Sequence, residues 1–302
     1  MKSRLIPLLA LVAALLLLQG CATGSVERAR DVSSAAIAYS EATLAVIDVA
    51  IDAVIDNDSE SQRNAPLAAV PAAQRAERLE QLDKGLVRSV QLYTELKQSV
   101  STTRAYFIAL QDLANGSQAE ATEEAVKSLA SRVGATSGAL ESDGAASGLS
   151  DEKVAALGGL AGLVAAQTHG AKVSRALSRD ADIIGRALLL QEEVLKQAGD
   201  DIRAYLKASN NRLFRVRVRI PYEKAELGPD WVADRRTYLK TRALGENHAS
   251  LQAADAAAAK MQVVWTRILG GSYTAGEIAA SLNDSAELLD AVVILRAADK
   301  PQ

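Results

Sequence analysis

The stretch that decides the fold is QRAERLEQLDKGLVRSVQLYTELKQSVSTTRAYFIALQDLA, residues 74–114. Apolar and small residues recur in it at alternating intervals of three and four, which places them along one face of a helix. That face comprises Leu79, Leu82, Leu86, Ser89, Tyr93, Leu96, Val100, Thr103, Phe107, Leu110 and Ala114. At 1.5 Å per residue the helix is about 60 Å long, so it needs long antiparallel neighbours or a second chain to cover its apolar face. Asn115 and Gly116 predict its C-terminal end.

Apolar residues have helical spacing in several further segments. These segments cover residues 26–56, 118–133, 184–213, 244–268 and a last helix that follows the capping box of Thr274 and Glu277 and ends near Ala298. We call such a line of apolar and small residues along one helix face a seam. Residues 184–213 form a second long seam, and residues 244–268 form a third. We therefore predict an all-α fold, an elongated antiparallel helical bundle with several long heptad-patterned helices.

Polar residues, prolines and glycines predict flexible loops near 57–73 and 134–150. Residues 26–302 are expected to form a single domain, because the long seams can be buried only against each other. Residues 215–220 alternate Arg with Val or Ile, which formally matches a strand. No second run has this alternation, so a helix that ends before Pro221 is preferred.

Composition and charge limit both the kind of core and the classes of partner that the chain can have. Hydrophobic residues make up 49% of the chain and aromatic residues only 4%, so the core must be built from small and aliphatic side chains. Without residues 1–20, which include Lys2 and Arg4, the chain has 32 basic and 37 acidic residues and a net charge of −5. A mildly acidic chain is a poor candidate for binding nucleic acid.

Residues 1–20 have the pattern of a cleaved secretory signal, with Lys2 and Arg4 ahead of an apolar stretch. That stretch is shorter than the roughly 20 apolar residues that a membrane span needs. It ends in Leu18-Gln19-Gly20-Cys21, with a branched apolar residue three positions before the cysteine and a small residue directly before it. This arrangement resembles the lipobox of bacterial lipoproteins.

The lipobox resemblance implies cleavage after Gly20 and acylation of Cys21, with residues 21–25 as a lipidated N-terminus and short tether. Cys21 is the only cysteine of the chain, so it has no disulfide partner within it. Two or three acyl chains anchor a protein stably where a single chain does not. Since no Asp follows Cys21, the resemblance to Gram-negative lipoproteins also implies a lipid-anchored location in the outer membrane, on its periplasmic side.

The sequence contains no recognisable catalytic pattern. Its two histidines, His169 and His248, each lack a second His or Cys at ligand spacing, and a zinc site needs three or four ligands. A nucleophile elbow, a phosphate loop, an HExxH helix and a dinucleotide fingerprint are all missing from the sequence. We expect no metal, no cofactor and no enzymatic activity, and the sequence identifies no small-molecule substrate.

The most unusual stretch is VAALGGLAGLVAAQTHG, residues 154–170, which contains no Asp, Glu, Lys or Arg. Gly158 and Gly162 form a GxxxG pair, which lets another helix approach closely. A tightly packed buried helix is the favoured interpretation. The alternative is an element that inserts into a membrane. A chain of long helices with one apolar segment is similar in architecture to α-helical pore-forming toxins.

Arg212, Arg215 and Arg219 would share one face of a persisting helix and could meet lipid phosphates or an acidic partner. Glu223 lies four residues beyond Arg219, so a self-neutralised, solvated face is favoured over a binding site. Trp231 and Trp265 could be core anchors or contact residues, and the core is preferred because the chain has few aromatic residues.

Two functional hypotheses follow. The first is a non-enzymatic, membrane-anchored helical scaffold that binds another envelope protein or a second copy of itself. The second is a membrane-perturbing protein that uses residues 154–170 as its insertion element.

Overall fold

The computed structural model describes residues 5–63, 65, 70–116, 120–142, 173–245, 260–267, 269 and 274–298. All regular secondary structure in these ranges is helical, which confirms the all-α fold class. The elements are α1 (Leu5–Arg63), α2 (Ala72–Ala114), α3 (Glu120–Ser142), α5 (Val173–Leu213), the π-helical turn η4 (Phe214–Arg219), α6 (Ile220–Glu223), α7 (Trp231–Gly245) and α9 (Ala275–Ala298). Residues 260–267 are helical as well.

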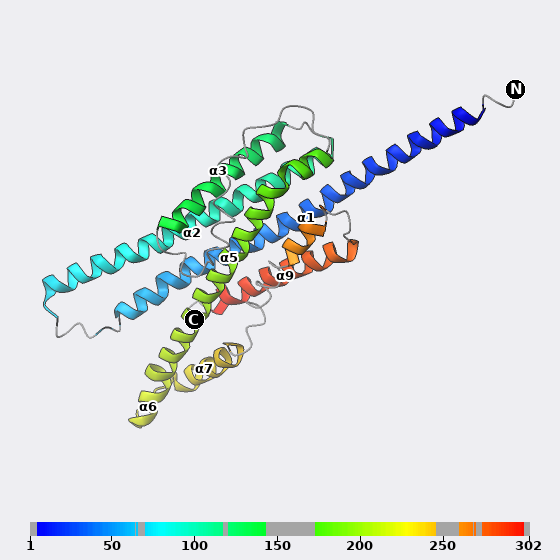
Figure 1. Cartoon of the computed structure of the whole chain (residues 1–302). Coiled ribbons are helices and arrows are strands. Elements are labelled where there is room, and N and C mark those ends of the chain that lie inside the picture. The colour runs from blue at the N-terminus through cyan, green and yellow to red at the C-terminus, as the bar shows by residue number, and fades with distance from the viewer. Residues whose placement is uncertain are drawn as a thin grey trace.

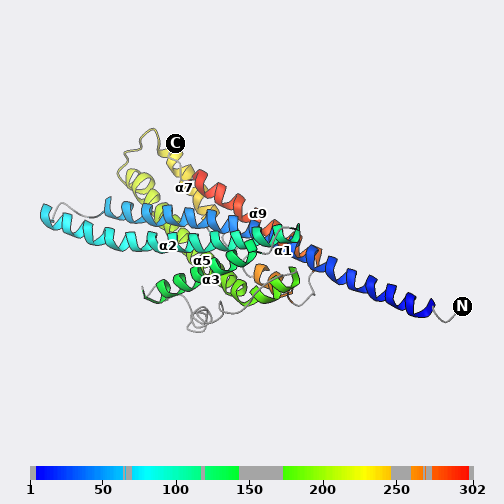
Figure 2. The same ribbon diagram turned by 90° about the horizontal axis from the view of Figure 1, so that it is seen from above.

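Helix α1 is the central element of the fold. It packs against α2, α5 and α9, and both α2 and α5 pack more extensively on α1 than on each other. Helix α2 returns antiparallel to α1, whereas α3, α5 and α9 run in the direction of α1 (Figures 1 and 2). The N-terminal part of α1 extends beyond the packed helices.

Small side chains explain why several helices can pack round α1. The alanines that it buries are Ala29, Ala35, Ala36, Ala42, Ala50 and Ala53, alternating with larger residues such as Tyr39 and Ile47. Short side chains at a contact reduce the distance between helix axes. The expectation that the long seams bury only against each other is therefore wrong for α2 and α5, because each packs more extensively on α1 than on the other.

The predicted seam of α2 is buried along only part of its length. Residues from Tyr93 to Ala114 contribute to the core, whereas Leu79 is 48% exposed and Leu82 and Leu86 are half-buried. Helix α3 lies alongside the C-terminal half of α2 only, and the first turns of α2 extend beyond the end of α1 (Figures 1 and 2). The helix ends as predicted, with Gly116 at a φ of 100°, a conformation that glycine adopts without strain.

The first predicted loop, 57–73, is shorter than expected. Helix α1 continues to Arg63, and α2 begins at Ala72. The carboxylate of Glu60 forms 2.8 Å ion pairs with Arg63, three residues further along α1, and with Arg212 of α5. These contacts hold the last turn of α1 in helical form.

The second predicted loop, 134–150, is helical in its first part, because α3 continues to Ser142. The hydroxyl of Thr136 donates to the carbonyl of Arg132 at 3.0 Å, so this buried polar group is satisfied within the helix. Residues 143–172 lie outside the described ranges. They include the whole segment 154–170.

Residues 215–220 are helical, as preferred, but the helix does not end before Pro221. The chain passes from α5 through the wider turn η4 into α6, and Pro221 lies in the first turn of α6. Proline has no N–H to donate to the preceding turn of this continuous helix, and the wider π-helical turn lies directly before it. The end comes four residues later, where Ala225 has a φ of 56°.

The capping box in front of the last helix is present. The main-chain N–H of Thr274 donates to the Glu277 carboxylate at 2.8 Å, and the N–H of Glu277 donates to the Thr274 hydroxyl at 3.3 Å. Helix α9 then runs to Ala298 and buries Ile278 and Val292 against the core.

Candidate interaction surface

The clearest candidate for a functional surface is the end of the molecule formed by η4, α6 and α7 as far as Arg242. We call these residues, 214–242, the tip. Helix α7 folds back on α5 and η4, and α6 lies at the extremity (Figure 1). The tip is near the C-terminal end of α1, far from the N-terminus in both views of the ribbon.

Aromatic contacts hold the two arms of the tip together. Phe214 and Tyr238 stack with ring centroids 4.6 Å apart, and Tyr222 and Trp231 stack at 5.9 Å. The indole N–H of Trp231 donates to the carbonyl of Val218 at 2.9 Å. The Arg235 guanidinium lies 5.9 Å from the centroid of the Trp231 ring, within the range of a cation–π contact.

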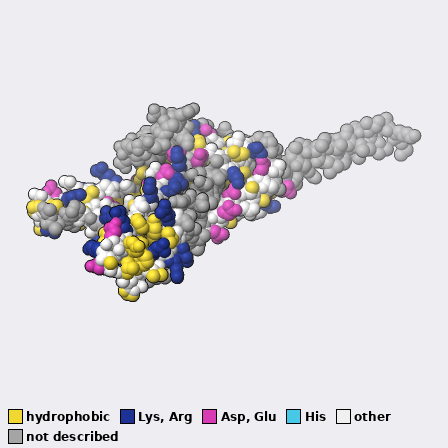
Figure 3. Space-filling view, turned by 90° about the horizontal axis from the view of Figure 1, so that it is seen from below, with side chains coloured by type: hydrophobic (Ala, Val, Ile, Leu, Met, Phe, Trp, Pro, Cys, Tyr) yellow, Lys and Arg dark blue, Asp and Glu magenta, His cyan; other side chains and the backbone are white. Residues whose placement is uncertain are grey.

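The outer side of the tip is apolar and basic. More than half of the large apolar side chains that lie exposed in the described ranges belong to it: Val216, Ile220, Tyr222, Leu227, Val232 and Leu239. The tip also has eight Lys and Arg residues against four Asp and Glu. Figure 3 shows the apolar side chains gathered on this end of the molecule, with Lys and Arg side chains around them.

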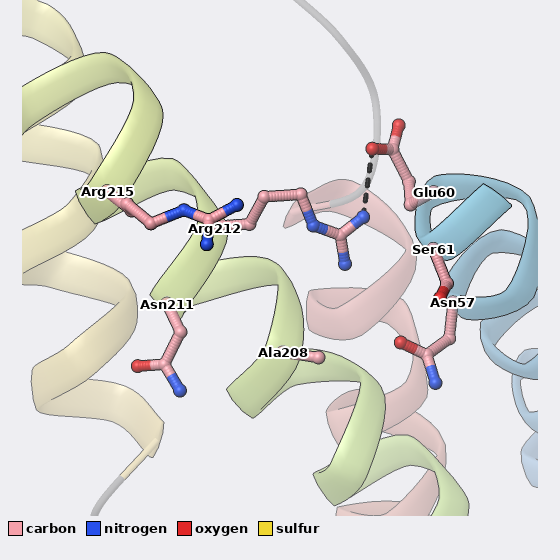
Figure 4. A pocket seen from close by; sticks show the side chains of 7 residues that line it. All are labelled: Asn57, Glu60, Ser61, Ala208, Asn211, Arg212 and Arg215. Atoms are coloured by element: carbon pink, nitrogen blue, oxygen red, sulfur yellow. Dashed lines mark hydrogen bonds and ion pairs between the residues drawn. The ribbon is translucent and has the colours of Figure 1, made fainter. Parts of the chain in front are cut away.

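Two of the three arginines singled out from the sequence lie together at the base of the tip. Arg212 and Arg215 line an open cavity of about 430 Å³ between the ends of α1 and α5. Asn57 and Ser61 line it from the α1 side, and the Arg212 side chain crosses it to the carboxylate of Glu60 at 2.8 Å (Figure 4). Much of the positive charge of Arg212 is therefore neutralised within the fold.

Arg219 does not contribute to this cavity. Its guanidinium pairs with Glu223 at 2.7 Å, and both side chains are more than half exposed. The helix does persist through these residues, but the π-helical turn changes the angular spacing between them. The three arginines are therefore not a single continuous cluster.

The two tryptophans have different environments. Trp265 is a core residue, as predicted: it is buried, packs edge-on against Phe107 at 5.9 Å and donates to the carbonyl of Ala181 at 3.3 Å. Trp231 is only half-buried and lies in the tip, so its assignment to the core is wrong. A second open cavity, of about 390 Å³, is lined by Trp265 together with Leu188 and Arg186.

Buried ionisable groups join helices in pairs. The hydroxyl of Tyr106 in α2 donates to Asp180 of α5 at 3.0 Å, and Arg179 holds the same carboxylate at 2.5 and 2.9 Å. Arg179 also reaches Glu123 of α3 at 3.4 Å. Burial, reinforced by the charge of Asp180, raises the pKa of Tyr106 well above its ordinary value. Hydrogen bonding to Asp180 raises the pKa of the Arg179 guanidinium.

A second such pair joins Tyr93 of α2 to Asp201 of α5, whose carboxylate accepts a hydrogen bond from the phenol and another from Gln197 at 3.3 Å. Burial, followed by the hydrogen bond to Asp201, raises the pKa of Tyr93 above its ordinary range. Neither pair lines one of the two cavities. Their role is to fix α2, α3 and α5 relative to one another.

Several residues that the sequence singles out have side chains outside the described part of the structure. Cys21 lies within α1, but its side chain is not described, and Gly158, Gly162, His169 and His248 lie outside the described residues. Within the described ranges, no group of three His, Cys, Asp or Glu residues is arranged to hold a metal ion.

One described helical segment, Ala29–Arg63 of α1, is long and apolar enough to cross a membrane by length and composition. In its most apolar window, 56% is buried inside the protein, where it forms the centre of the fold.

Sequence reasoning missed the tip as a surface. A signal for it was present: four of the eleven aromatic residues of the chain, Phe214, Tyr222, Trp231 and Tyr238, fall in the same 29 residues as eight of its Lys and Arg. The alternation of Arg with Val and Ile was interpreted mainly for secondary structure, and Arg215 and Arg219 were considered only as part of an arginine face that Glu223 would neutralise. No protein-family model matches the chain, and no curated protein or solved structure shows significant similarity to it.

Proposed function

We propose that the mature chain is a membrane-anchored lipoprotein, on the periplasmic side of the outer membrane, that serves as a non-enzymatic helical scaffold with the tip as its recognition surface. The observation that carries this proposal is the exposed apolar and basic character of the tip. Contiguous apolar surface on a soluble protein is typical of sites that bind a partner.

The arrangement of polar groups supports a scaffold more than an enzyme. Catalytic sites bring titratable groups with perturbed pKa values together in a cleft. Here Tyr93, Tyr106 and Arg179 are paired across helix interfaces, Tyr39 is buried in the core, and none of these four perturbed groups lines the two cavities described above. The sequence Leu18-Gln19-Gly20-Cys21 supports the anchor.

The anchor is tested with Cys21→Ser, and Thr23→Ser serves as the matched control. We expect Cys21→Ser to block lipid attachment and to remove the protein from the outer-membrane fraction, whereas Thr23→Ser leaves both unchanged. Identical processing and fractionation of the two variants would contradict the anchor.

The recognition surface is tested with a photoreactive amino acid at Val232 of the tip, and the control position is Val87 of α2, which is also exposed. We expect light to produce a defined adduct, with protein or lipid, from position 232 in intact cells and not from position 87. Equal yields from both positions would contradict the role of the tip.

A further inference from the structure

We propose that the partner of the tip is the surface of a membrane that contains anionic lipid. This inference rests on the proposed role of the tip as a recognition surface and adds the chemistry of what it recognises. It is carried by the apolar side chains on the outer side of the tip and by the basic side chains round them (Figure 3).

The apolar part of the tip has the composition of a membrane-interface element. Tyr222 is 66% exposed and Val232 62% exposed, and Leu227 lies at the turn between α6 and α7. The Tyr222 ring stacks on Trp231, whose indole N–H already has a protein acceptor in Val218. Tyr and Trp rings favour the headgroup level of a bilayer, where their apolar bodies leave water and their polar atoms remain hydrated.

The charge of the tip is opposite to that of the rest of the chain. Eight Lys and Arg against four Asp and Glu give residues 214–242 a net charge of +4, although the mature chain has a net charge of −5. One of the four acids, Glu223, is paired with Arg219. Lys and Arg residues close to an anionic leaflet are attracted by its negative surface potential.

The shape of the tip favours a lipid surface over an acidic protein. Protein partners are usually held by anchor residues that fill pockets at the centre of an interface. The two cavities described above are lined by residues of α1, α5 and the segment 260–269, and only Arg215 of the tip contributes to either. Apolar side chains at the end of a projecting hairpin, with cations round them, match the pattern of elements that lie in a membrane interface.

The contact is separate from the acyl anchor. The N-terminal end of α1 and the tip lie at opposite ends of the molecule (Figures 1 and 2). Residues 21–63 of α1 alone extend about 64 Å at 1.5 Å per residue. The tip must therefore bind lipid by its own residues, and it can be tested in protein that has no acyl chain.

The experiment measures binding of the mature chain, residues 21–302 with Cys21→Ser, to vesicles. One vesicle population is made of equal parts phosphatidylglycerol and phosphatidylcholine, and the other of phosphatidylcholine alone. Co-sedimentation gives the bound fraction. Tryptophan fluorescence gives a second signal, because Trp231 lies at the tip whereas Trp265 is buried in the core.

Two double variants of the tip separate the contribution of charge to vesicle binding from that of apolar area. Arg217→Gln with Arg236→Gln removes two exposed cations, and each is expected to lower binding to anionic vesicles about fivefold. Tyr222→Ser with Val232→Ser removes two exposed apolar groups, and each is expected to lower it roughly tenfold at full insertion.

The matched controls are on α2, where similar exposed residues lie outside the tip. They are Lys84→Gln with Arg88→Gln for charge and Leu79→Ser with Val87→Ser for apolar area. Circular dichroism verifies that each variant is as helical as the parent chain.

The proposal predicts binding to the anionic vesicles, a blue shift in fluorescence that Trp231→Phe abolishes, and losses in the tip variants alone. Absence of binding, equal binding to both vesicle types, or equal losses in the α2 controls would overturn it. Adducts of position 232 with an acidic protein and none with lipid would also overturn it. In that case a Cys21-dependent location would still support the proposed function, so the two failures are distinguishable.

Discussion

The indole N–H of Trp231 donates to the main-chain carbonyl of Val218 at 2.9 Å, and so connects the start of α7 to the π-helical end of α5. This bond joins the two arms of the tip across thirteen residues of chain. It acts together with the stacking of Tyr222 on Trp231 and of Phe214 on Tyr238. The tip is therefore an ordered surface that presents its exposed side chains in a fixed arrangement.

We predict that Trp231→Phe loosens the tip and leaves the rest of the fold intact. Phenylalanine keeps an aromatic ring but loses the N–H donor, at a cost of about 1 kcal/mol. Amide hydrogen exchange across residues 214–242 is expected to accelerate about fivefold, the equivalent of that free energy. The control is Thr237→Ala in α7, whose hydroxyl bonds only to its own helix at Ala233. Unchanged exchange in Trp231→Phe would show that the bond does not hold the tip.

The contact between Tyr106 and Asp180 yields a second prediction, for global stability. Asp180 is buried and accepts hydrogen bonds from Tyr106 and Arg179, so Asp180→Ala leaves two donors without their acceptor. We expect a loss of about 3 kcal/mol in the free energy of unfolding, measured with urea. The control is Glu41→Gln, which breaks the solvent-exposed pair with Arg104 and is expected to cost less than about 1 kcal/mol. If Asp180→Ala costs as little free energy of unfolding as Glu41→Gln, the interface between α2 and α5 is hydrated.

The buried tyrosines predict alkaline instability. Burial raises the pKa values of Tyr39, Tyr93 and Tyr106, so the folded chain keeps three protons that the unfolded chain releases. Their contribution to stability is fully present below about pH 10, the ordinary tyrosine pKa. Above it, stability falls by about 1.4 kcal/mol per pH unit for each tyrosine, because the unfolded state then binds fewer protons.

The measurement is the urea midpoint as a function of pH, with Tyr106→Phe expected to remove the share of one tyrosine from the slope. The chain has seven tyrosines, and one of them, Tyr222, is 66% exposed, so the informative signal is the difference in tyrosinate absorbance between the parent chain and Tyr106→Phe. That difference should appear together with the loss of helical circular dichroism. Its appearance before unfolding would show that the Tyr106 phenol is open to water.

The fold class and the positions of α2, α5 and α9 were predictable because they depend on local spacing. The seams of α2 and α5 and the capping box of Thr274 and Glu277 each lie within one continuous segment of sequence. The central position of α1 was not predictable in the same way. It depends on small residues such as Ala35, Ala42 and Ala50 facing several helices at once, and periodicity identifies one apolar face without showing how many partners cover it.

The loop boundaries were missed for a related reason. Polar residues at the end of α1 suggested a loop, but Glu60 is held in helical form by Arg212, which lies 152 residues away in sequence. The tip was missed because exposure is a tertiary property. The residues Val216 and Val232 look like core residues in sequence, and only the absence of a covering element in the described fold makes them a surface.

The exposed half of the α2 seam gives the last prediction. Leu79 and Leu110 both belong to the predicted apolar face of α2, yet Leu110 is fully buried and Leu79 is 48% exposed. Leu110→Ala should cost about 3 kcal/mol through lost burial and the cavity that remains. Leu79→Ala should change stability by less than about 0.5 kcal/mol, because alanine also favours the helix.

Urea unfolding of both variants at two protein concentrations makes this comparison decisive. If Leu79→Ala is as costly as Leu110→Ala and the cost depends on protein concentration, a second chain covers the first half of α2 in solution. A large cost at all concentrations would instead mean that α2 packs within the chain along its whole length. Only a small, concentration-independent cost agrees with a helix whose first turns are open to solvent, where Leu79 adds little to the stability of the fold.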